Sequence, residues 1–181
     1  MEFTAFALPG PVLIAPKRHG DARGYFMETF RADAFAAAVG PFEFVQENQS
    51  LSAQVGTVRG LHFQTRPMAQ GKLVRCVAGS IFDVAIDIRH DSPHFGKWVS
   101  AELSADNGHQ LWVPPGFAHG FCTLLPDTVV SYKVTAYYSP SDDKGMAWDD
   151  PALGIEWPAT ADPGTLSGKD RVQPKLADLP P

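Results

Sequence analysis

The chain has 181 residues, of which 44% are hydrophobic and 19% are charged, as is typical of a soluble globular protein with one sizeable core. We therefore predict a single domain over residues 1–181. The formal net charge of −5 argues against a general nucleic-acid binder, which needs a basic field to meet phosphates, and no stretch approaches the ~18–20 apolar residues of a membrane span.

The first segment, MEFTAFALPGPVLIAP, is apolar but does not have the pattern of a signal peptide. It carries an acid at Glu2, lacks a basic n-region and contains prolines where an apolar helix would have to run. The two cysteines, Cys76 and Cys122, lie in apolar, strand-like runs, and buried reduced thiols are their simplest interpretation, although the sequence leaves open whether they approach one another. Together these features favour a cytoplasmic protein.

A helix is predicted only at residues 31–39, RADAFAAAV, because this stretch is rich in alanine and is followed by Gly40 and Pro41. Elsewhere the apolar residues come in short runs separated by Gly, Pro, Asn, Asp and Ser. The main runs are KLVRCVAG, SIFDVAIDI, KWVSAEL, QLWVPPG, GFCTLL and TVVSYKVTAYY. Short strands with frequent turn signals predict an all-β barrel or sandwich, of which the jelly roll is one form.

The chain changes character from Pro158 onward. Apolar density falls, and prolines and glycines punctuate the tail PATADPGTLSGKDRVQPKLADLPP. Such a tail is either a surface segment or one that returns to a functional site, and composition alone leaves both open.

Two histidine-containing motifs in the β-rich region resemble the paired motifs of the cupin superfamily, which consists of small double-stranded β-helix barrels. The first motif begins in GTVRGLHFQ and continues from Lys72 to Gly79, and the second runs from Gly108 through PPGFAHG. The resemblance implies a cupin-type jelly roll, with one or a few short helices, whose mouth holds the chemistry.

In metal-binding cupins these motifs supply three histidines and a glutamate. The present chain keeps His62 and His119 but has Gln64 in place of one histidine and Lys72 in place of the glutamate. Two histidines with an amide and an ammonium are a poor cage for a divalent cation. We therefore predict no metal and no other cofactor, and expect the fixed charge of Lys72 to stabilise a developing oxyanion or enolate instead.

Seven segments, in order and across residues 12–175, resemble the dTDP-4-dehydrorhamnose 3,5-epimerase family. They are DARGYFMETF, FVQENQS, GTVRGLHFQ, AQGKLVRCVAGSIFDVAIDIRHDSPHFGKW, LWVPPGFAHGF, SYKVTAYYSP and WDDPALGIEWP. The resemblance implies an epimerase that converts a thymidine-diphosphate keto sugar, dTDP-4-dehydro-6-deoxy-D-glucose, to dTDP-4-dehydro-L-rhamnose by inverting C3 and C5. It also implies a homodimer that serves rhamnose synthesis for a cell-surface polysaccharide.

The resemblance assigns four catalytic residues. His62 matches the base, and Asp170, in the tail segment LSGKD, matches the carboxylate that orients it, which would explain why the tail returns to the barrel. Lys72 would hold the enolate charge. Tyr132 matches the acid that reprotonates carbon from the opposite face.

The resemblance also assigns the residues that bind the substrate. Arg23 and Arg59 match positions that grip the diphosphate or sugar, since a guanidinium fork suits phosphate oxygens. Tyr138 matches an aromatic that stacks on thymine and is preferred over Tyr137 because its spacing from Tyr132 would put both on one strand face. The remaining binding positions are Phe26, Glu28, Gln46, Asn48, His119, Asp143 and Lys169, where Asp143 stands in place of a common glutamate.

Three other functions remain as alternatives. A mono-epimerase of a related nucleotide keto sugar would share the architecture, a metal-dependent cupin oxygenase would need the metal that Gln64 and Lys72 disfavour, and a binding cupin would perform no proton transfer. The remaining polar and turn residues of these motifs are expected to be structural: His19, His90, His94, His109, Arg75, Arg89, Gly56, Gly79 and Gly116.

Overall fold

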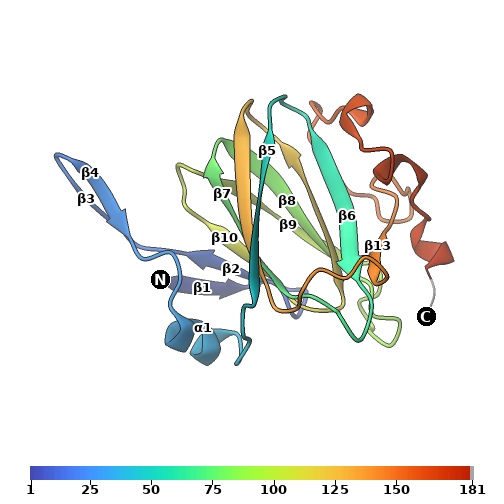
Figure 1. The fold of residues 1–181 in the computed structure, drawn as a ribbon, viewed down its shortest axis with the longest axis horizontal. Helices are drawn as coiled ribbons and strands as arrows, with labels where there is room; N and C mark the ends of the chain where they lie inside the picture. Colours follow the sequence, from blue (N-terminus) through green and yellow to red (C-terminus); the bar gives the residue numbers. More distant parts are fainter. Residues whose placement is uncertain (180–181) are drawn as a thin grey trace.

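The computed structural model describes residues 1–179 and consists mainly of antiparallel strands in two facing sheets (Figure 1). The six-stranded sheet has the order β1 (Glu2–Ala5), β2 (Val12–Ala15), β10 (Gln110–Val113), β7 (Lys72–Ala78), β12 (Thr128–Val134) and β5 (Gln46–Ser52). The five-stranded sheet has the order β13 (Asp143–Gly145), β6 (Val58–Gln64), β11 (Phe117–Thr123), β8 (Ser80–Asp87) and β9 (Trp98–Ser104). This confirms the predicted all-β jelly roll.

Side chains that point inward from the strands fill the space between the two sheets. Ile81 and Ala85 of β8 and Phe117 and Phe121 of β11 belong to one buried cluster with Val74 of β7. Because successive side chains of a strand point to opposite faces, every second residue of β7, β8 and β11 faces this interior. The same positions carry the polar residues discussed below.

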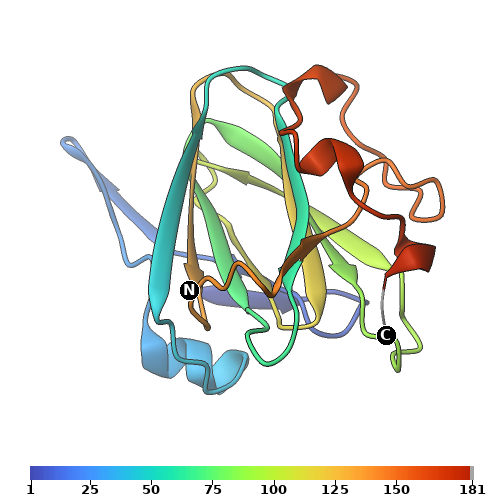
Figure 2. The same ribbon diagram turned by 45° about the vertical axis from the view of Figure 1, so that its right-hand side comes forward.

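The outer face of the five-stranded sheet is covered by the C-terminal segment, from Leu153 to Leu179 (Figure 2). Leu61, Val84 and Ile86 pack there against Leu153 and Leu176. The segment contains three short 3-10 turns: η1 (Pro163–Thr165), η2 (Asp170–Val172) and η3 (Leu176–Asp178). Its apolar contacts hold the tail beside β6.

Backbone and side-chain hydrogen bonds also tie this segment to the preceding chain. The amide of Leu176 donates to Asp150 Oδ2 at 2.7 Å, and the amide of Ala147 donates to the Pro174 carbonyl at 2.7 Å. The indole of Trp98 donates to the Leu153 carbonyl at 2.9 Å. The tail is therefore fixed at several points, which lets it present a side chain to the barrel.

The predicted helix is present as α1 (Ala32–Ala38). It buries Phe35 against Trp112 of β10, with the ring centroids 5.2 Å apart. Gly40 follows with a φ of +136°, a conformation that disfavours side chains, and helps to end the helix. Among residues 1–179, no helix combines the length and apolarity that crossing a bilayer requires.

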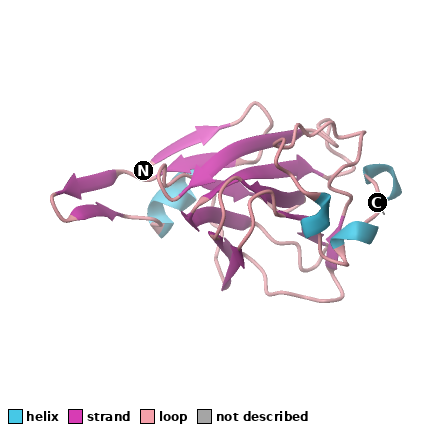
Figure 3. Ribbon diagram, turned by 90° about the horizontal axis from the view of Figure 1, so that it is seen from above, coloured by secondary structure: helices cyan, strands magenta, loops and turns pink. Residues whose placement is uncertain are grey.

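The hairpin of β3 (Arg18–Asp21) and β4 (Gly24–Met27) projects away from the barrel (Figures 1 and 3). Two aromatic side chains of β4 lie in solvent, Tyr25 at 58% exposure and Phe26 at 73%. Large exposed aromatic rings on a projecting element are unusual for a protein that acts as an isolated chain.

Beside the candidate site, the strands β6 and β11 approach unusually closely. A Cβ at Gly60 would lie 2.6 Å from the Gly120 Cα, and Gly60 has a φ of +115°. Only glycine fits both the contact and the conformation. Gly56, Gly79 and Gly116 also have positive φ, and both cysteines are free and buried as predicted.

Candidate active site

His62 and Asp170 form a close pair between the barrel and the tail. His62 lies on β6, and its Nε2 is 2.5 Å from Oδ1 of Asp170 at the start of η2. The side chain of His62 is 34% exposed and that of Asp170 only 5%. The imidazole thus faces open space while its carboxylate partner is held inside the protein.

The protonation of this pair follows from the charges. Burial raises the pKa of Asp170, but the hydrogen bond and the charge of His62 outweigh it, and the net pKa lies below its usual value. An ionised carboxylate can only accept a hydrogen bond, so His62 Nε2 carries the proton and Nδ1 has the free lone pair. The pair therefore prepares Nδ1 as a base.

Lys72 is the first residue of β7 and is buried. Its Nζ donates to the main-chain oxygen of His62 at 3.2 Å. Burial lowers the pKa of Lys72 to about 8, although the nearby carboxylates of Asp143 and Asp83 raise it in part. The side chain is thus an ammonium at neutral pH, within reach of the histidine that precedes it by ten residues in sequence.

Tyr132 lies on β12 and pairs in register with Asn48 of β5. Burial raises the pKa of its phenol above the usual value, with a smaller opposing effect from Arg59. The hydroxyl therefore keeps its proton through the neutral range and can donate it.

His62, Lys72 and Tyr132 line one cavity of about 320 Å³. Five further residues predicted at the sequence level lie on its wall: Gln46, Asn48, Tyr138, Asp143 and Lys169. Phe63, Gln64 and Gln70 complete the lining. A larger hollow of about 720 Å³ lies beside β9, but it contains none of the predicted site residues.

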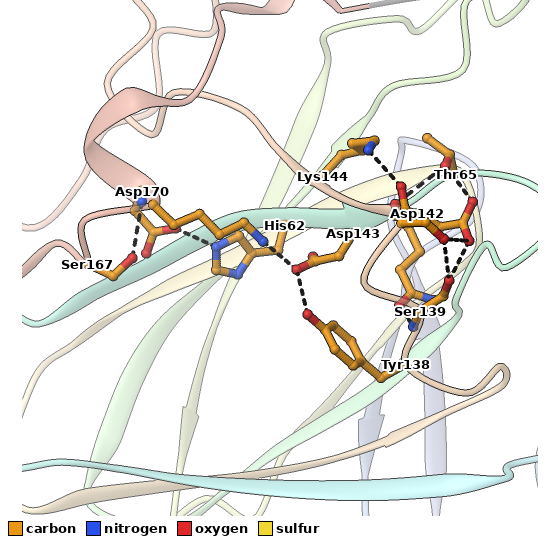
Figure 4. A network of polar contacts seen from close by, with 12 residues as sticks. His62, Thr65, Tyr138, Ser139, Asp142, Asp143, Lys144, Ser167 and Asp170 are labelled. Carbon is orange, nitrogen blue, oxygen red and sulfur yellow. Dashed lines mark hydrogen bonds and ion pairs between the residues drawn. The ribbon is translucent and has the colours of Figure 1, made fainter.

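Asp143 links three segments at the mouth of this cavity (Figure 4). Its Oδ2 accepts a hydrogen bond from the hydroxyl of Tyr138 at 3.2 Å and forms an ion pair with Nζ of Lys169. Asp143 belongs to β13, Tyr138 to the loop after β12, and Lys169 to the tail immediately before Asp170. The shorter acid at this position thus contacts two neighbouring side chains of the site.

Tyr138 lines the cavity and Tyr137 does not, but the reason differs from strand alternation. β12 ends at Val134, so neither tyrosine lies on a strand. The Tyr138 amide donates to Gln46 Oε1 at 3.0 Å, and the Tyr137 carbonyl accepts from Gln64 Nε2 at 3.1 Å. Amide side chains inside the barrel therefore set the orientation of this loop.

Five predicted binding residues lie outside the cavity lining within one chain: Arg23, Phe26, Glu28, Arg59 and His119. Arg23 and Phe26 are on the projecting hairpin, where Arg23 pairs with Asp21 at 2.6 Å, and Glu28 follows in exposed chain. Arg59 lies on β6 with its guanidinium donating to the Leu51 carbonyl at 2.9 Å. Arg23, Phe26 and Glu28 thus lie on or next to the β3–β4 hairpin, which projects away from the barrel.

His119 is buried on β11, and its Nε2 lies 2.7 Å from Oδ1 of Asp83 on β8. Asp83 was not identified from the sequence. The pattern SIFDVAIDI places it between Ile81 and Ala85 on the inward face of a strand, and an acid at such a position is the signal that could have identified it. The structure thus contains a second histidine–aspartate pair.

Among residues 1–179, no three His, Cys, Asp or Glu side chains are grouped in a way that could hold a metal ion. Gln64, at the position of a cupin metal ligand, instead uses its amide to bind backbone groups. Its Nε2 donates to the Met68 carbonyl at 2.6 Å, and its Oε1 accepts from the Ser139 amide at 2.8 Å. These bonds make Gln64 an organiser of the loops around the cavity.

Comparisons with known proteins identify the relatives of this barrel. Residues 5–178 match a family model described as dTDP-4-dehydrorhamnose 3,5-epimerase. The enzyme of that name from Sinorhizobium fredii is 59% identical over 99% of this chain and 92% of its own length. The one from Pseudomonas aeruginosa is 47% identical over 98% of this chain and 97% of its own length.

Solved structures agree with the sequence matches. A dTDP-4-dehydrorhamnose 3,5-epimerase from Bacillus anthracis, with TDP and pyrophosphate bound, superposes with a TM-score of 0.92 at 46% identity and covers 96% of this chain and 98% of its own. A 3'-monoepimerase from Streptomyces bikiniensis, bound to dTDP-quinovose, has a TM-score of 0.90 at 32% identity, with 96% and 87% covered. The fold and these relatives define an isomerase built on a cupin jelly roll. More particularly, the chain belongs to the dTDP-4-dehydrorhamnose 3,5-epimerase family.

Proposed function

We propose that this enzyme converts dTDP-4-dehydro-6-deoxy-D-glucose to dTDP-4-dehydro-L-rhamnose by inverting C3 and C5, without a metal or other cofactor. The observation that carries the proposal is the convergence of His62, Lys72 and Tyr132 on one cavity, with Asp170 supporting the histidine from the tail. A base, a fixed cation and a phenol are the groups that proton transfer beside a ketone requires.

The first chemical step is proton removal next to the C4 ketone. The ketone acidifies the hydrogens on C3 and C5, because the carbanion that forms is stabilised as an enolate. Nδ1 of His62 takes the proton, and the carboxylate of Asp170 stabilises the imidazolium that results. The open side of the imidazole gives the sugar access to this nitrogen.

Lys72 stabilises the enolate oxygen in the same step. A buried ammonium acts strongly on nearby charge because little water screens it. Its single hydrogen bond within the described chain, to the His62 main-chain oxygen, leaves donors for the substrate.

Tyr132 returns a proton to carbon from the other face. Its phenol remains protonated at neutral pH because burial raises its pKa. Return of the proton from the face opposite His62 inverts the carbon, whereas return from His62 would restore the starting configuration. We therefore expect Tyr132→Phe to slow or redirect epimerisation more than it weakens binding, and unchanged product ratios would remove Tyr132 as the acid.

The nucleotide occupies the outer part of the cavity. The ring of Tyr138 is 56% exposed at the mouth and can stack on thymine, and Lys169 beside it can meet phosphate oxygens. Gln46 and Asn48 supply polar contacts and hold each other through a hydrogen bond of 2.8 Å. Arg59, whose charge acts on Tyr132, can grip the diphosphate or sugar, and the buried His119 supports the site from outside the lining.

We propose that the projecting hairpin completes the site of a second copy in a homodimer. Arg23, Phe26 and Glu28 lie outside the lining of their own cavity, and the exposed aromatic rings of Tyr25 and Phe26 offer a surface that a second copy could cover. A symmetric dimer would exchange the two hairpins and bring an arginine to each diphosphate.

Mixing two inactive variants tests the exchange of hairpins. The protomers of the His62→Ala and Arg23→Ala variants are mixed and allowed to reassociate. If the hairpins are exchanged, each mixed dimer has one site in which both residues are native. Because about half of the dimers are mixed, about a quarter of the native activity should return. Sedimentation would verify the dimer. No recovery in mixed dimers would show that Arg23 serves its own chain.

The function itself is tested by incubating the protein with dTDP-4-dehydro-6-deoxy-D-glucose in deuterated water and locating deuterium by NMR. Label at both C3 and C5 supports the double epimerisation, while label at one carbon indicates a mono-epimerase. That alternative is retained because a 3'-monoepimerase shares the fold at a TM-score of 0.90. No label would leave a binding protein, and loss of exchange in a chelator, with recovery on adding a metal, would overturn the metal-free mechanism.

We further propose that the enzyme acts in the cytoplasm, within the synthesis of dTDP-rhamnose for cell-surface polysaccharide. The support is its relationship to enzymes named for this substrate, among them the one from Sinorhizobium fredii.

A further inference from the structure

The buried carboxylate of Asp83 has one satisfied oxygen and one unsatisfied oxygen. Oδ1 accepts from His119 Nε2 at 2.7 Å, whereas Oδ2 has no hydrogen-bond partner and is shielded from solvent. Asp83 is 0% exposed. Leaving a buried acceptor unpaired typically costs ~1–3 kcal/mol of stability, and more for a charged group, so the arrangement calls for a functional explanation.

The position of Asp83 in the barrel indicates what the carboxylate faces. Asp83 shares the inward face of β8 with Ile81 and Ala85, and His119 shares the inward face of β11 with Phe117 and Phe121. Lys72 lies inward on β7 with Val74. All three polar side chains therefore point into the interior between the sheets, and Lys72 also lines the cavity with His62 and Tyr132.

A nearby residue shows how the same strand satisfies an ordinary structural carboxylate. Asp87, also on β8 and 0% exposed, accepts from Arg89 at 2.6 Å and from Ser92 at 2.6 Å through Oδ2, and from the Arg89 amide at 3.0 Å through Oδ1. Both of its oxygens are used. Asp83 lacks this second set of partners, so no hydrogen bond offsets the negative charge at its Oδ2.

We propose that Asp83 is a positioning residue of the epimerase site, which fixes the orientation of His119 through Oδ1 and acts as the counter-charge of the Lys72 ammonium through the field of the carboxylate. This inference rests on the proposed function and extends it to a buried residue on the inward face of β8. Asp83 touches neither the base nor the acid, and it acts on the substrate only through His119 and Lys72.

The charges around Lys72 show why a counter-charge is needed. Asp143 on β13 and Asp83 on β8 favour its charged form, Lys169 in the tail opposes it, and burial opposes it most. His62 on β6 and Tyr132 on β12 face the same space, and β10 contributes Val113 as the register partner of Lys72. Asp143 forms an ion pair with Lys169, whereas Oδ2 of Asp83 has no hydrogen-bond partner, so the charge at this oxygen remains available to Lys72.

The decisive substitution is Asp83→Asn. An amide oxygen can still accept from His119, so the geometry is retained while the charge is removed. We expect turnover near pH 7.5 to fall roughly tenfold with little change in binding of dTDP, and the alkaline limb of the kcat profile to move to lower pH. Thermal stability should stay the same or rise, because an unpaired buried charge has been removed.

Asp87→Asn is the matched control, since it removes a buried carboxylate from the same face of the same strand. It should lose stability, because Arg89 and Ser92 lose a partner, but its kcat profile should keep the native alkaline limb. If Asp83→Asn behaves like this control, with lower stability and an unmoved limb, Asp83 has only a structural role and the proposal is wrong.

A titration of Lys72 provides a test that does not depend on activity. In protein labelled with ¹³C at lysine Cε, with the signal assigned by its loss in Lys72→Arg, the resonance should titrate at about 8. Its midpoint should fall further in Asp83→Asn. An unchanged midpoint in Asp83→Asn would overturn the role of Asp83 as a counter-charge. Because this readout is independent of turnover, failure of the proposed epimerase activity would be distinguished from failure of this inference.

Discussion

The two histidine–aspartate pairs of this barrel have similar contacts but opposite surroundings. Nε2 meets Oδ1 at 2.5 Å in His62–Asp170 and at 2.7 Å in His119–Asp83. The first histidine is 34% exposed and its partner comes from the tail, while the second is 7% exposed and its partner comes from the adjacent strand. The environment, rather than the contact, therefore determines what each pair can do.

The open pair can exchange a proton with a ligand, whereas the buried pair cannot release one to solvent easily. A base must present its lone pair to substrate, and only His62 lines the cavity. A buried pair instead supplies a fixed arrangement of charge and dipole, which stabilises a transition state without reorganisation. We therefore assign proton transfer to the mouth and electrostatic support to the interior.

The largest effect is expected from removing the imidazole at the mouth. His62→Ala should reduce deuterium uptake at C3 and C5 by at least about 10³-fold, because no other base lies at that position. Binding of dTDP should stay within a few-fold of the native value. His94→Ala, on a loop remote from the cavity lining, serves as the control. Turnover retained by His62→Ala would move the base elsewhere.

Exchanging the carboxylates for amides compares the two pairs directly. Asp170→Asn should lower turnover by about 10²-fold or more, because an amide can stabilise the wrong tautomer of His62 and cannot balance an imidazolium. The loss should exceed that of Asp83→Asn. Equal losses from the two substitutions would contradict the division between mouth and interior.

The same variant has a predictable effect on stability against pH. The folded-state pKa of Asp170 lies below its usual value, so its contribution to stability is present above the ordinary carboxyl range and is lost as pH falls through the lowered pKa. Asp170→Asn lacks this contribution. Its free energy of unfolding should therefore approach that of the native protein in acid, as measured by denaturant titration.

Lys72→Met tests whether the buried charge of Lys72, which turnover requires, lowers the free energy of unfolding. Lys72 loses its proton at about 8 in the folded state and near its ordinary value when unfolded, so its burial destabilises the native enzyme fully below pH 8 and progressively less up to about 10.5. Methionine should abolish turnover yet raise the free energy of unfolding at pH 7 by an amount on the order of 3 kcal/mol. The gain should shrink between pH 8 and 10.5. A variant that is less stable than native at pH 7 would show that packing outweighs the charge.

The sequence predicted the parts of this molecule that depend on local pattern. Short apolar runs separated by turn residues indicated the β architecture, and an alanine-rich stretch indicated α1. Arg89, which was expected to be structural, forms an ion pair with Asp87. The resemblance to the family also identified His62, Lys72 and Tyr132, which the structure places around one cavity.

The features that the sequence did not reveal depend on long-range arrangement. Asp83 and His119 are 36 residues apart, and only the pairing of β8 with β11 brings them together. The projection of the β3–β4 hairpin away from the barrel (Figure 1) was likewise not predicted from its own residues. The orientation of Tyr138 depends on two glutamines inside the barrel, and strand alternation gave the correct residue for a reason that does not apply there.

The smallest effect is expected at the rim of the mouth, where Tyr138→Phe keeps the ring and removes only the hydroxyl that donates to Asp143 at 3.2 Å. A single partly exposed hydrogen bond contributes about 0.5–1.5 kcal/mol, so dTDP should bind only a few-fold more weakly while kcat is unchanged. Isothermal titration calorimetry with dTDP, alongside Tyr137→Phe as the control, would measure this. A large fall in kcat would mean that the contact with Asp143 and Lys169 also controls Asp170, the next residue in the chain, and that the mouth and the catalytic pair work as one unit rather than as separate regions.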